Sequence, residues 1–387
     1  MKVLLTTDLS RPAVNGVVIS VTNLYKELKK HGHEVKILTL SLEEESYKNG
    51  DIYYIKAMKT GIYDTAYISF RLFDHYINEI IEWNPDIIHT NCEFSTYSFA
   101  EKIHKETKAP IVHTYHTMYE HYISYLIKYG TDFAKSLLYP FMNMRLKSSD
   151  LIIAPTGKVK SALLNNGMKK MIRVIPTGID LSKFEYRYSE EEKKEFKKEL
   201  GINENSFILG SLGRIAEEKN FSESLEIFKE VLRFKPNIYY IIVGDGPYKK
   251  SLEEEAMNLG IRDKIIFTGM VEPNNVSKYY QIFDCFISST ISETQGLTYI
   301  EALVNKNAII ARKDKATEDI LFHGENSLLY ENKEEGIKYL LNLIEDKDLL
   351  KRLQEKADES KTTFSTETFY EKIIGVYKEI LDKEKNR

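Results

Sequence analysis

The chain has 387 residues, of which 42% are hydrophobic and 29% are charged, the proportions of a soluble globular protein. This length exceeds what one hydrophobic core usually serves and favours two domains. The net charge is −4, and the low isoelectric point of about 6.2 argues against a nucleic-acid-binding protein. No stretch approaches the roughly 20 apolar residues that span a bilayer.

The N-terminal residues Met-Lys-Val-Leu-Leu run directly into a predicted strand and do not resemble a signal peptide. Cys92 and Cys285 are too few for a disulfide framework or a cysteine metal site. We therefore expect a cytoplasmic protein with two buried free thiols.

Short apolar strands alternate with helical stretches through the first half of the chain. The strands are predicted at residues 3–6, 35–40, 87–89, 111–113 and 151–154. The first helix follows Gly16 and carries apolar residues at Val17, Val21, Leu24 and Leu28. This alternation predicts a parallel, doubly wound α/β sheet.

Gly16 lies between the first strand and the first helix. Because glycine has no Cβ, the main chain there can approach a phosphate or a sugar at the carboxyl end of the sheet. An ordinary turn glycine explains the same position.

Residues 113–122, His-Thr-Tyr-His-Thr-Met-Tyr-Glu-His-Tyr, follow a predicted strand and so lie at the edge where such sheets bind ligands. A histidine there can exchange protons or donate a hydrogen bond to a sugar oxygen. Three histidines and a glutamate also permit a metal site, but their spacing matches no standard zinc pattern. The tyrosines at 115, 119, 122, 125 and 129 either pack in the core or line an acceptor cleft.

Residues 125–148 mix leucine, phenylalanine and methionine with lysine and arginine. This composition suits a helix that lies in a lipid interface. It also suits an ordinary domain helix with solvated lysines.

The second half repeats the alternation, with strands predicted at residues 207–213, 239–243, 265–270, 283–287 and 308–311. Arg214 and Lys219 lie in the loop after the first of these strands. Two cations five residues apart converge on one anion only if the loop folds around it. Separately solvated charges are the alternative.

Residues 286–303 read as a strand, a polar loop and a helix that starts near Gly296. The first amides of a helix have no partner within it, so Leu297 and Thr298 can donate to a phosphate. Glu293 and Glu301 flank this point, and carboxylates accept hydrogen bonds from hydroxyls but repel phosphate. The pattern indicates a nucleotide-sugar, although two solvated glutamates remain an alternative.

Glu293, seven intervening residues and Glu301, with Gly296 between them, resemble the E-x7-E signature of retaining glycosyltransferases of family 4. The resemblance implies the GT-B fold, with two Rossmann-like doubly wound domains that face a central cleft. It implies that Glu293 meets the donor sugar, that Glu301 meets the ribose, and that the amides near Leu297 and Thr298 meet the diphosphate.

Other positions match the same family. Arg214 and Lys219 resemble its G-R-x4-K motif, which neutralises the donor diphosphate. Gly16 matches one glycine of its Gly-Gly pair, since Asn15 replaces the other, and Met270 follows the glycine near which the family contacts the base. The family's domain plan implies an acceptor-binding domain over residues 1–182, a nucleotide-sugar-binding domain over 183–365 and a final helix, 366–387, that returns to the first domain.

The run from His116 to Glu120, His-Thr-Met-Tyr-Glu, is similar to that of bacterial glycosyltransferases that act on diacylglycerol, the 1,2-diacylglycerol 3-glucosyltransferases. His116 matches their acceptor-side histidine. This likeness favours contact with an anionic membrane surface and a peripheral position on the inner face of the cell membrane.

The combined expectation is a retaining hexosyltransferase that moves glucose, as first choice, from a UDP-sugar to diacylglycerol. Its catalytic residues would be His116, Glu293, Arg214 and Lys219, with no metal and no tightly bound cofactor. The alternatives are a small-molecule or oligosaccharide acceptor, a UDP-sugar 2-epimerase, a non-catalytic nucleotide-sugar sensor and an enzyme like glycogen phosphorylase that carries pyridoxal phosphate.

Overall fold

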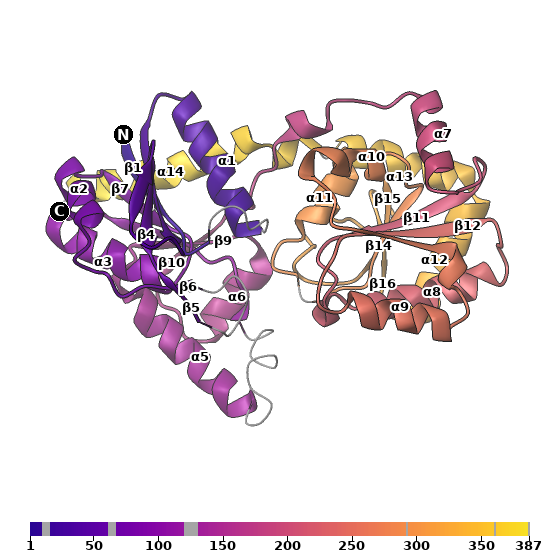
Figure 1. Cartoon of the computed structure of the whole chain (residues 1–387), viewed down its shortest axis with the longest axis horizontal. Helices are drawn as coiled ribbons and strands as arrows, with labels where there is room; N and C mark the ends of the chain where they lie inside the picture. The colour runs from indigo at the N-terminus through magenta and orange to yellow at the C-terminus, as the bar shows by residue number, and fades with distance from the viewer. Residues whose placement is uncertain (10–15, 61–66, 120–130, 292, 360, 386–387) are drawn as a thin grey trace. The chain divides into compact units, whose positions relative to one another are not determined.

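The computed structural model describes residues 1–9, 16–60, 67–119, 131–291, 293–359 and 361–385 (Figure 1). The chain forms two compact units, the first made of Met1–Ile179 with Ser365–Arg387 and the second of Asp180–Phe364. The chain therefore leaves the first unit after Ile179 and re-enters it at Ser365. The sequence predicts the borders between these units at residues 182/183 and 365/366, whereas they lie at 179/180 and 364/365 in the structure.

The first unit is built on an eight-stranded sheet with the order β10-β9-β8-β7-β1-β2-β4-β3. Every neighbouring pair is parallel except β3 and β4. Its strands are β1 (Lys2–Thr6), β2 (Glu34–Ser41), β3 (Tyr47–Asn49), β4 (Ile52–Lys56), β7 (Ile87–Thr90), β8 (Ile111–Thr114), β9 (Leu151–Ala154) and β10 (Met171–Val174). A separate two-stranded sheet pairs β5 (Met58–Lys59) with β6 (Tyr67–Ile68).

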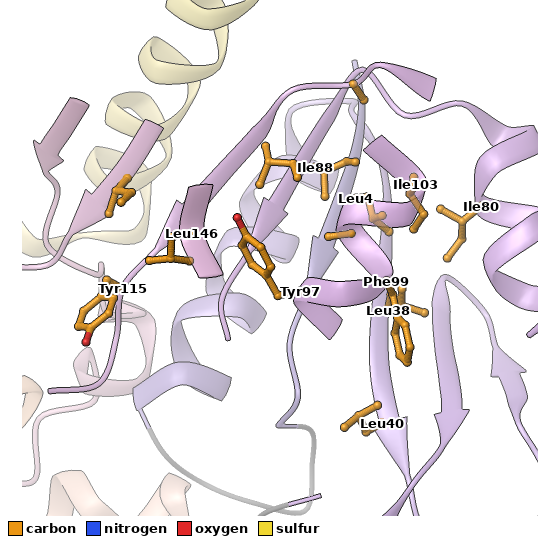
Figure 2. Close-up of a cluster of buried hydrophobic side chains, with 14 of the residues drawn as sticks. Leu4, Leu38, Leu40, Ile80, Ile88, Tyr97, Phe99, Ile103, Tyr115 and Leu146 are labelled. Atoms are coloured by element: carbon orange, nitrogen blue, oxygen red, sulfur yellow. The ribbon is translucent and has the colours of Figure 1, made fainter. Parts of the chain in front are cut away.

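Helices cover both faces of the first sheet. They are α1 (Gly16–Lys30), α2 (His75–Trp83), α3 (Ser95–Thr107), α5 (Thr131–Arg145), α6 (Gly157–Asn165) and α14 (Thr366–Lys385), with the short 3-10 helix η2 (Leu146–Ser148). Because successive side chains of a strand point to opposite faces, β1 serves two cores. Leu4 packs in the cluster drawn in Figure 2, and Val3 and Leu5 pack with α1 and α14 on the other face.

The last helix, α14, belongs to the first unit although it follows the second in sequence. Phe369, Ile373 and Tyr377 are buried against Leu5 and Leu24. The helix thus covers apolar surface that the first 179 residues leave open.

The second unit is built on a six-stranded parallel sheet with the order β13-β12-β11-β14-β15-β16. Its strands are β11 (Phe207–Leu212), β12 (Ile238–Val243), β13 (Ile265–Gly269), β14 (Cys285–Ser288), β15 (Ala308–Arg312) and β16 (Leu328–Tyr330). Its helices are α7 (Glu190–Glu199), α8 (Phe221–Leu232), α9 (Lys249–Asn258), α10 (Val276–Tyr280), α11 (Leu297–Val304), α12 (Lys333–Glu345) and α13 (Lys347–Glu359). Short 3-10 helices join them: η3 (Leu181–Phe184), η4 (Glu217–Lys219), η5 (Arg262–Lys264), η6 (Pro273–Asn275) and η7 (Lys361–Phe364).

The strand order reverses at one point in each sheet. In the first sheet this point lies between β1 and β7, and in the second it lies between β11 and β14. In doubly wound sheets ligands bind outside the carboxyl ends of the strands at this point. The loops after β1, β7, β11 and β14 are therefore where a site is expected, and the predicted doubly wound α/β architecture is confirmed.

Candidate active site

Two loops of the second unit meet at the carboxyl edge of its sheet. One follows β11 and carries Arg214 and Lys219, and the other follows β14 and carries Glu293. Asn220 Nδ2 donates to Ser289 O at 3.3 Å, and Thr290 Oγ1 donates to Glu218 O at 3.4 Å. These bonds hold the loops together, so residues about 75 positions apart share one site.

Each predicted cation of this site is paired with a carboxylate. Lys219 Nζ lies 2.6 Å from Glu293 Oε1, and both side chains are largely buried, at 27% and 15% exposed. Arg214 forms an ion pair with Glu218, which lies within the predicted motif. Lys219, which is predicted to bind the diphosphate, thus lies beside Glu293, which is predicted to bind the sugar.

The helix α11 begins next to this pair. Its N-cap, Gly296, has a φ of 77°, in the left-handed region that glycine adopts without strain. A Cβ on Gly296 would lie 2.5 Å from Cδ2 of Tyr299, so the space itself also requires glycine. The amides of Leu297 and Thr298 are in the first turn, where a helix offers donors and the positive end of its dipole.

Glu301 lies one turn further along α11 and is partly buried. Tyr280 donates from its hydroxyl to Glu301 Oε2 at 2.9 Å and approaches Thr298 O at 3.2 Å. Burial raises the pKa of Glu301 to about 7, although the hydrogen bond from Tyr280 opposes the shift. Tyr280 is thus a partner of the site that the sequence does not identify.

Met270 follows the end of β13, and its side chain is 78% exposed. Gly269 has a φ of 71° and accepts a hydrogen bond from the Gly244 amide at 3.1 Å. Met270 is thus an exposed residue at the same edge of the sheet as Arg214.

In the first unit, His116 lies just after β8 and is partly exposed. Its Nε2 lies 2.9 Å from Oδ1 of Asn91, which directly follows β7. Burial, followed by the charge of His113, lowers the pKa of His116 to about 3, so its ring is neutral at pH 7.

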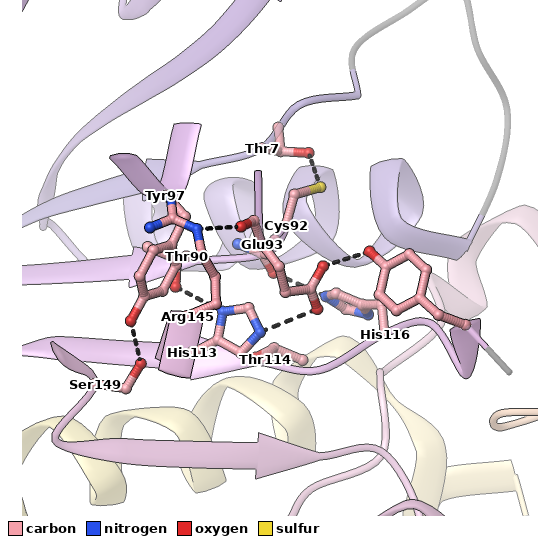
Figure 3. Close-up of polar contacts among 12 residues, drawn as sticks. Thr7, Thr90, Cys92, Glu93, Tyr97, His113, Thr114, His116, Arg145 and Ser149 are labelled. Atoms are coloured by element: carbon pink, nitrogen blue, oxygen red, sulfur yellow. Dashed lines mark hydrogen bonds and ion pairs between the residues drawn. The ribbon is translucent and has the colours of Figure 1, made fainter. Parts of the chain in front are cut away.

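A buried polar cluster lies next to His116 (Figure 3). His113 Nε2 lies 3.2 Å from Glu93 Oε1, and the Tyr119 hydroxyl donates to the other oxygen of Glu93. Arg145 from α5 donates to the Glu93 carbonyl at 2.9 Å. The sequence alone does not identify Asn91 and Glu93 as site residues, although both follow the apolar strand predicted at 87–89.

Gly16 is the first residue of α1 and is exposed. It belongs with His116 to the first unit, whereas the other predicted site residues belong to the second. Part of the predicted acceptor stretch, Glu120 to Tyr122 with Tyr125 and Tyr129, lies outside the described residues.

One group of possible metal ligands occurs among the residues that the structure describes, namely Glu27, His31 and Glu367. Lys30 Nζ already lies 3.2 Å from Glu27 and 2.8 Å from Glu367. The group joins the C-terminal end of α1 to α14, at the amino edge of the sheet. It is an ion-pair cluster that fastens α14, and it lies away from the strand ends described above.

Two family models match the chain, one on each half. Residues 14–183 match "Glycosyltransferase Family 4", and residues 192–360 match "Glycosyl transferases group 1". The gap between the two matches, residues 184–191, lies at the start of the second unit, shortly after the chain leaves the first at Ile179.

Two relatives carry the same name, alpha-monoglucosyldiacylglycerol synthase. The protein from Streptococcus pneumoniae is 36% identical over 85% of this chain and 76% of its own length. The protein from Acholeplasma laidlawii is 30% identical over 99% of this chain and 98% of its own length.

Among solved structures, Anabaena HepE in complex with UDP and glucose superposes with a TM-score of 0.78 at 16% identity, covering 98% of this chain and 100% of that one. Sucrose-phosphate synthase from Thermosynechococcus elongatus gives a TM-score of 0.78 at 17% identity, covering 99% of each chain. At these identities the structures establish the fold alone. Taken with the two family models and the two synthases, they show that the chain belongs to the family 4 glycosyltransferases and has the GT-B fold.

Proposed function

We propose that this glycosyltransferase moves a hexose, glucose as first choice, from a UDP-sugar to the free hydroxyl of diacylglycerol with retention of the anomeric configuration. The observation that carries the proposal is the contact of 2.6 Å between Lys219 and Glu293 beside the first turn of α11. It combines a cation, helix amides and a carboxylate, which suit a diphosphate joined to a hydroxylated ring.

The donor is proposed to lie along α11. Its ribose hydroxyls would donate to Glu301, its diphosphate would meet the Leu297 and Thr298 amides with Arg214 and Lys219, and its sugar would meet Glu293. The turn at Met270 would receive the base. Anabaena HepE, which shares the fold, has been solved with UDP-glucose, and this supports UDP as the carrier.

Cleavage of the sugar–phosphate bond leaves negative charge on the nucleotide diphosphate. Arg214, Lys219 and the α11 amides are proposed to stabilise that charge, and such preorganised donors commonly supply a large part of catalysis. Glu293 is the carboxylate proposed to meet the sugar, and it already pairs with Lys219. A same-face substitution, in which the departing phosphate takes the proton of the acceptor, therefore fits better than a covalent glycosyl-enzyme.

Diacylglycerol is proposed as the acceptor on two grounds. Both synthases described above are named for a glucosylated form of diacylglycerol. One of them aligns with almost the whole chain. The second ground is an exposed apolar stripe on α5, made of Leu137, Phe141 and Met144.

This stripe is separate from the surface by which α5 packs on its own unit. Leu137, Phe141 and Met144 are 53%, 42% and 66% exposed and follow helical spacing, so they share one face. Met142 and Leu146 are buried on the opposite side. Exposed Lys147 lies at its end, and an apolar face edged by a cation suits the surface of an anionic membrane.

None of the helices in the described part of the chain is long and apolar enough to cross a membrane. The proposal is therefore a peripheral contact through α5, on the inner face of the cell membrane.

The deciding experiment incubates the protein with several UDP-sugars and vesicles that contain diacylglycerol, and then separates lipid-linked from water-soluble products. The expected result is a glucolipid whose anomeric proton has the configuration of the donor. A soluble glycoside as sole product would overturn the lipid acceptor, and change of the UDP-sugar without any acceptor would point to an epimerase. UDP binding without any product would leave a nucleotide-sugar sensor.

A further inference from the structure

The imidazole of His116 is held by a side chain that no motif of the chain includes. Asn91 follows β7, is 3% exposed, and places Oδ1 at 2.9 Å from His116 Nε2. Since β7 and β8 are neighbours in the sheet, this contact joins the ends of two adjacent strands at the carboxyl edge. Its chemistry depends on which atom of each group carries hydrogen.

The orientation of the Asn91 amide follows from its other contacts. Nδ2 lies 3.3 Å from the carbonyl oxygen of Thr6 and 3.4 Å from that of His89. Carbonyl oxygens only accept hydrogen bonds, so the group that faces them must be the NH2 group. The atom that faces His116 is therefore the amide oxygen, which also only accepts.

The state of the His116 ring follows in turn. Nε2 must carry a hydrogen in order to donate to Oδ1 of Asn91. The ring is neutral at pH 7, because burial and the nearby charge of His113 lower its pKa to about 3. A neutral imidazole has only one N–H group, so Nδ1 carries no hydrogen and keeps a lone pair that can accept a hydrogen bond.

We propose that Asn91 is a positioning residue that fixes the tautomer of His116, so that Nδ1 accepts a hydrogen bond from a hydroxyl of the substrate. This inference rests on the proposed function for the identity of the substrate. The hydroxyl belongs either to the donor sugar or to the glycerol of the acceptor, which share this chemistry. His116 contributes by orienting that hydroxyl and does not act as an acid.

The tautomer can be read directly in wild-type protein labelled with 15N-histidine. The His116 signal is identified by its loss in His116→Gln. At pH 7.5 we expect a protonated Nε2 and a bare Nδ1. A protonated Nδ1, or a charged ring, would overturn the proposal, and this readout does not depend on any enzyme activity.

The kinetic arm uses Asn91→Asp, which keeps the shape, replaces the amide with a carboxylate and also removes the Nδ2 hydrogen bonds to the Thr6 and His89 carbonyls. A carboxylate at Nε2 favours the charged ring, in which Nδ1 becomes a donor. Since a neighbouring carboxylate raises a pKa by about 1–3 units from a starting value of about 3, we expect kcat/KM to fall by up to about 10-fold near pH 5 and to recover as the pH rises and the ring loses its proton. The titration of Glu301 acts equally on both proteins, so the extra loss is read from the ratio of the variant to the wild type at each pH.

Other ionisable groups near the ring are His89, His113 and Glu93, and none of them is altered by the Asn91 substitution. The matched control is Thr114→Val. It removes a buried hydrogen bond of 2.6 Å between Thr114 on β8 and His89 Nε2 on β7. We expect this control to lower the melting temperature without changing the tautomer or the pH profile. An identical pH profile in Asn91→Asp and in the wild type would also overturn the proposal.

Two further rates identify the hydroxyl. If it belongs to the donor, Asn91→Asp should slow the hydrolysis of UDP-glucose measured without lipid. If it belongs to the acceptor, hydrolysis should be unchanged and the KM for diacylglycerol should rise. A wild-type protein that transfers no sugar to lipid but shows the expected tautomer would contradict the proposed function and leave the assignment of Nδ1 intact.

Discussion

Glu301 is a carboxyl group whose surroundings disfavour its charge. Burial raises its pKa to about 7 from a usual value of 4.5, so near pH 6 it is mostly protonated and near pH 8 it is mostly ionised. The ionised form is the stronger acceptor for the proposed contact with ribose hydroxyls. We therefore expect UDP-glucose to bind more weakly at pH 6 than at pH 8, by at most tenfold per pH unit below the pKa.

Calorimetry should use UDP-glucose rather than UDP, because UDP carries a terminal phosphate that itself titrates near pH 6. Glu301→Gln should bind more weakly at pH 8 and lose the pH dependence between 6 and 8. Equal affinities of the wild type at both pH values would contradict a role for this carboxylate in binding.

The two cations of the second unit allow a prediction about rate. Lys219→Met and Arg214→Met should each lower kcat by about 10²- to 10³-fold, because each removes a donor from the place where the leaving group gains charge. Lys235→Met is a suitable control, since Lys235 pairs with Glu345 at 2.7 Å as an exposed surface bridge. A tenfold or smaller loss for both site variants, measured as release of UDP, would argue against this role.

The site residues differ in how far the sequence predicts them. Arg214, Lys219 and Glu293 were predicted separately, and the structure brings the last two into contact. Asn91 and Tyr280 were missed because their importance comes from a partner on another element. Such pairings depend on how neighbouring strands and helices pack, which local spacing does not report.

At the scale of elements, the start of α11 is a turn with little room for a side chain. Gly296→Ala places a methyl group 2.5 Å from the Tyr299 ring, at a φ of 77°. We expect a loss of about 1–3 kcal/mol in the free energy of unfolding and at least tenfold weaker UDP binding, because the amide donors must shift.

Gly324→Ala is the control for this substitution. Gly324 has a φ of 80° and no atom within 4 Å of a built Cβ, so it isolates the backbone strain from the steric contact. It should cost about 1 kcal/mol in stability and leave UDP binding unchanged. Equal effects of both substitutions on nucleotide affinity would show that the anion site does not depend on the α11 turn.

The exposed stripe of α5 predicts membrane binding. Replacing Leu137, Phe141 and Met144 together by serine removes apolar area worth about 1 kcal/mol per half-exposed side chain. Partition onto anionic vesicles should fall by roughly 100-fold, while hydrolysis of UDP-glucose in solution stays the same. Met257→Ser is the control, because Met257 is 56% exposed on α9 of the second unit. Unchanged sedimentation of the triple variant with vesicles would exclude α5 as the contact.

The sequence predicts the central strands of both sheets, and it also predicts the edge strand β13. β1, β7, β8, β11 and β14 each contain an apolar run and are largely buried, because a parallel sheet is covered on both faces. β4, β10 and β16 were missed, and they lie toward the edges of their sheets. Short runs with polar interruptions can satisfy an edge, so their pattern is weaker.

At the scale of the molecule, the return of α14 predicts an asymmetry in stability. Deleting residues 366–387 uncovers Leu5, Leu24 and their neighbours, whereas the second unit, Asp180–Phe364, keeps its core. The truncated protein should lose the unfolding transition of the first unit and retain the other, as followed by calorimetry. Tyr377→Phe is the milder variant. It removes a 2.6 Å hydrogen bond to His89 Nδ1 and should cost about 1 kcal/mol.

The interrupted layout of the first unit also bears on how the protein is made. The strands of that unit's sheet are synthesised early. The helix that covers one of its faces, α14, emerges from the ribosome last, after all of Asp180–Phe364. At about 5–20 residues per second the nascent sheet waits roughly 10–40 s for it. The middle of the polypeptide can thus finish folding before its beginning does, and the unsealed face is then the natural target for a chaperone.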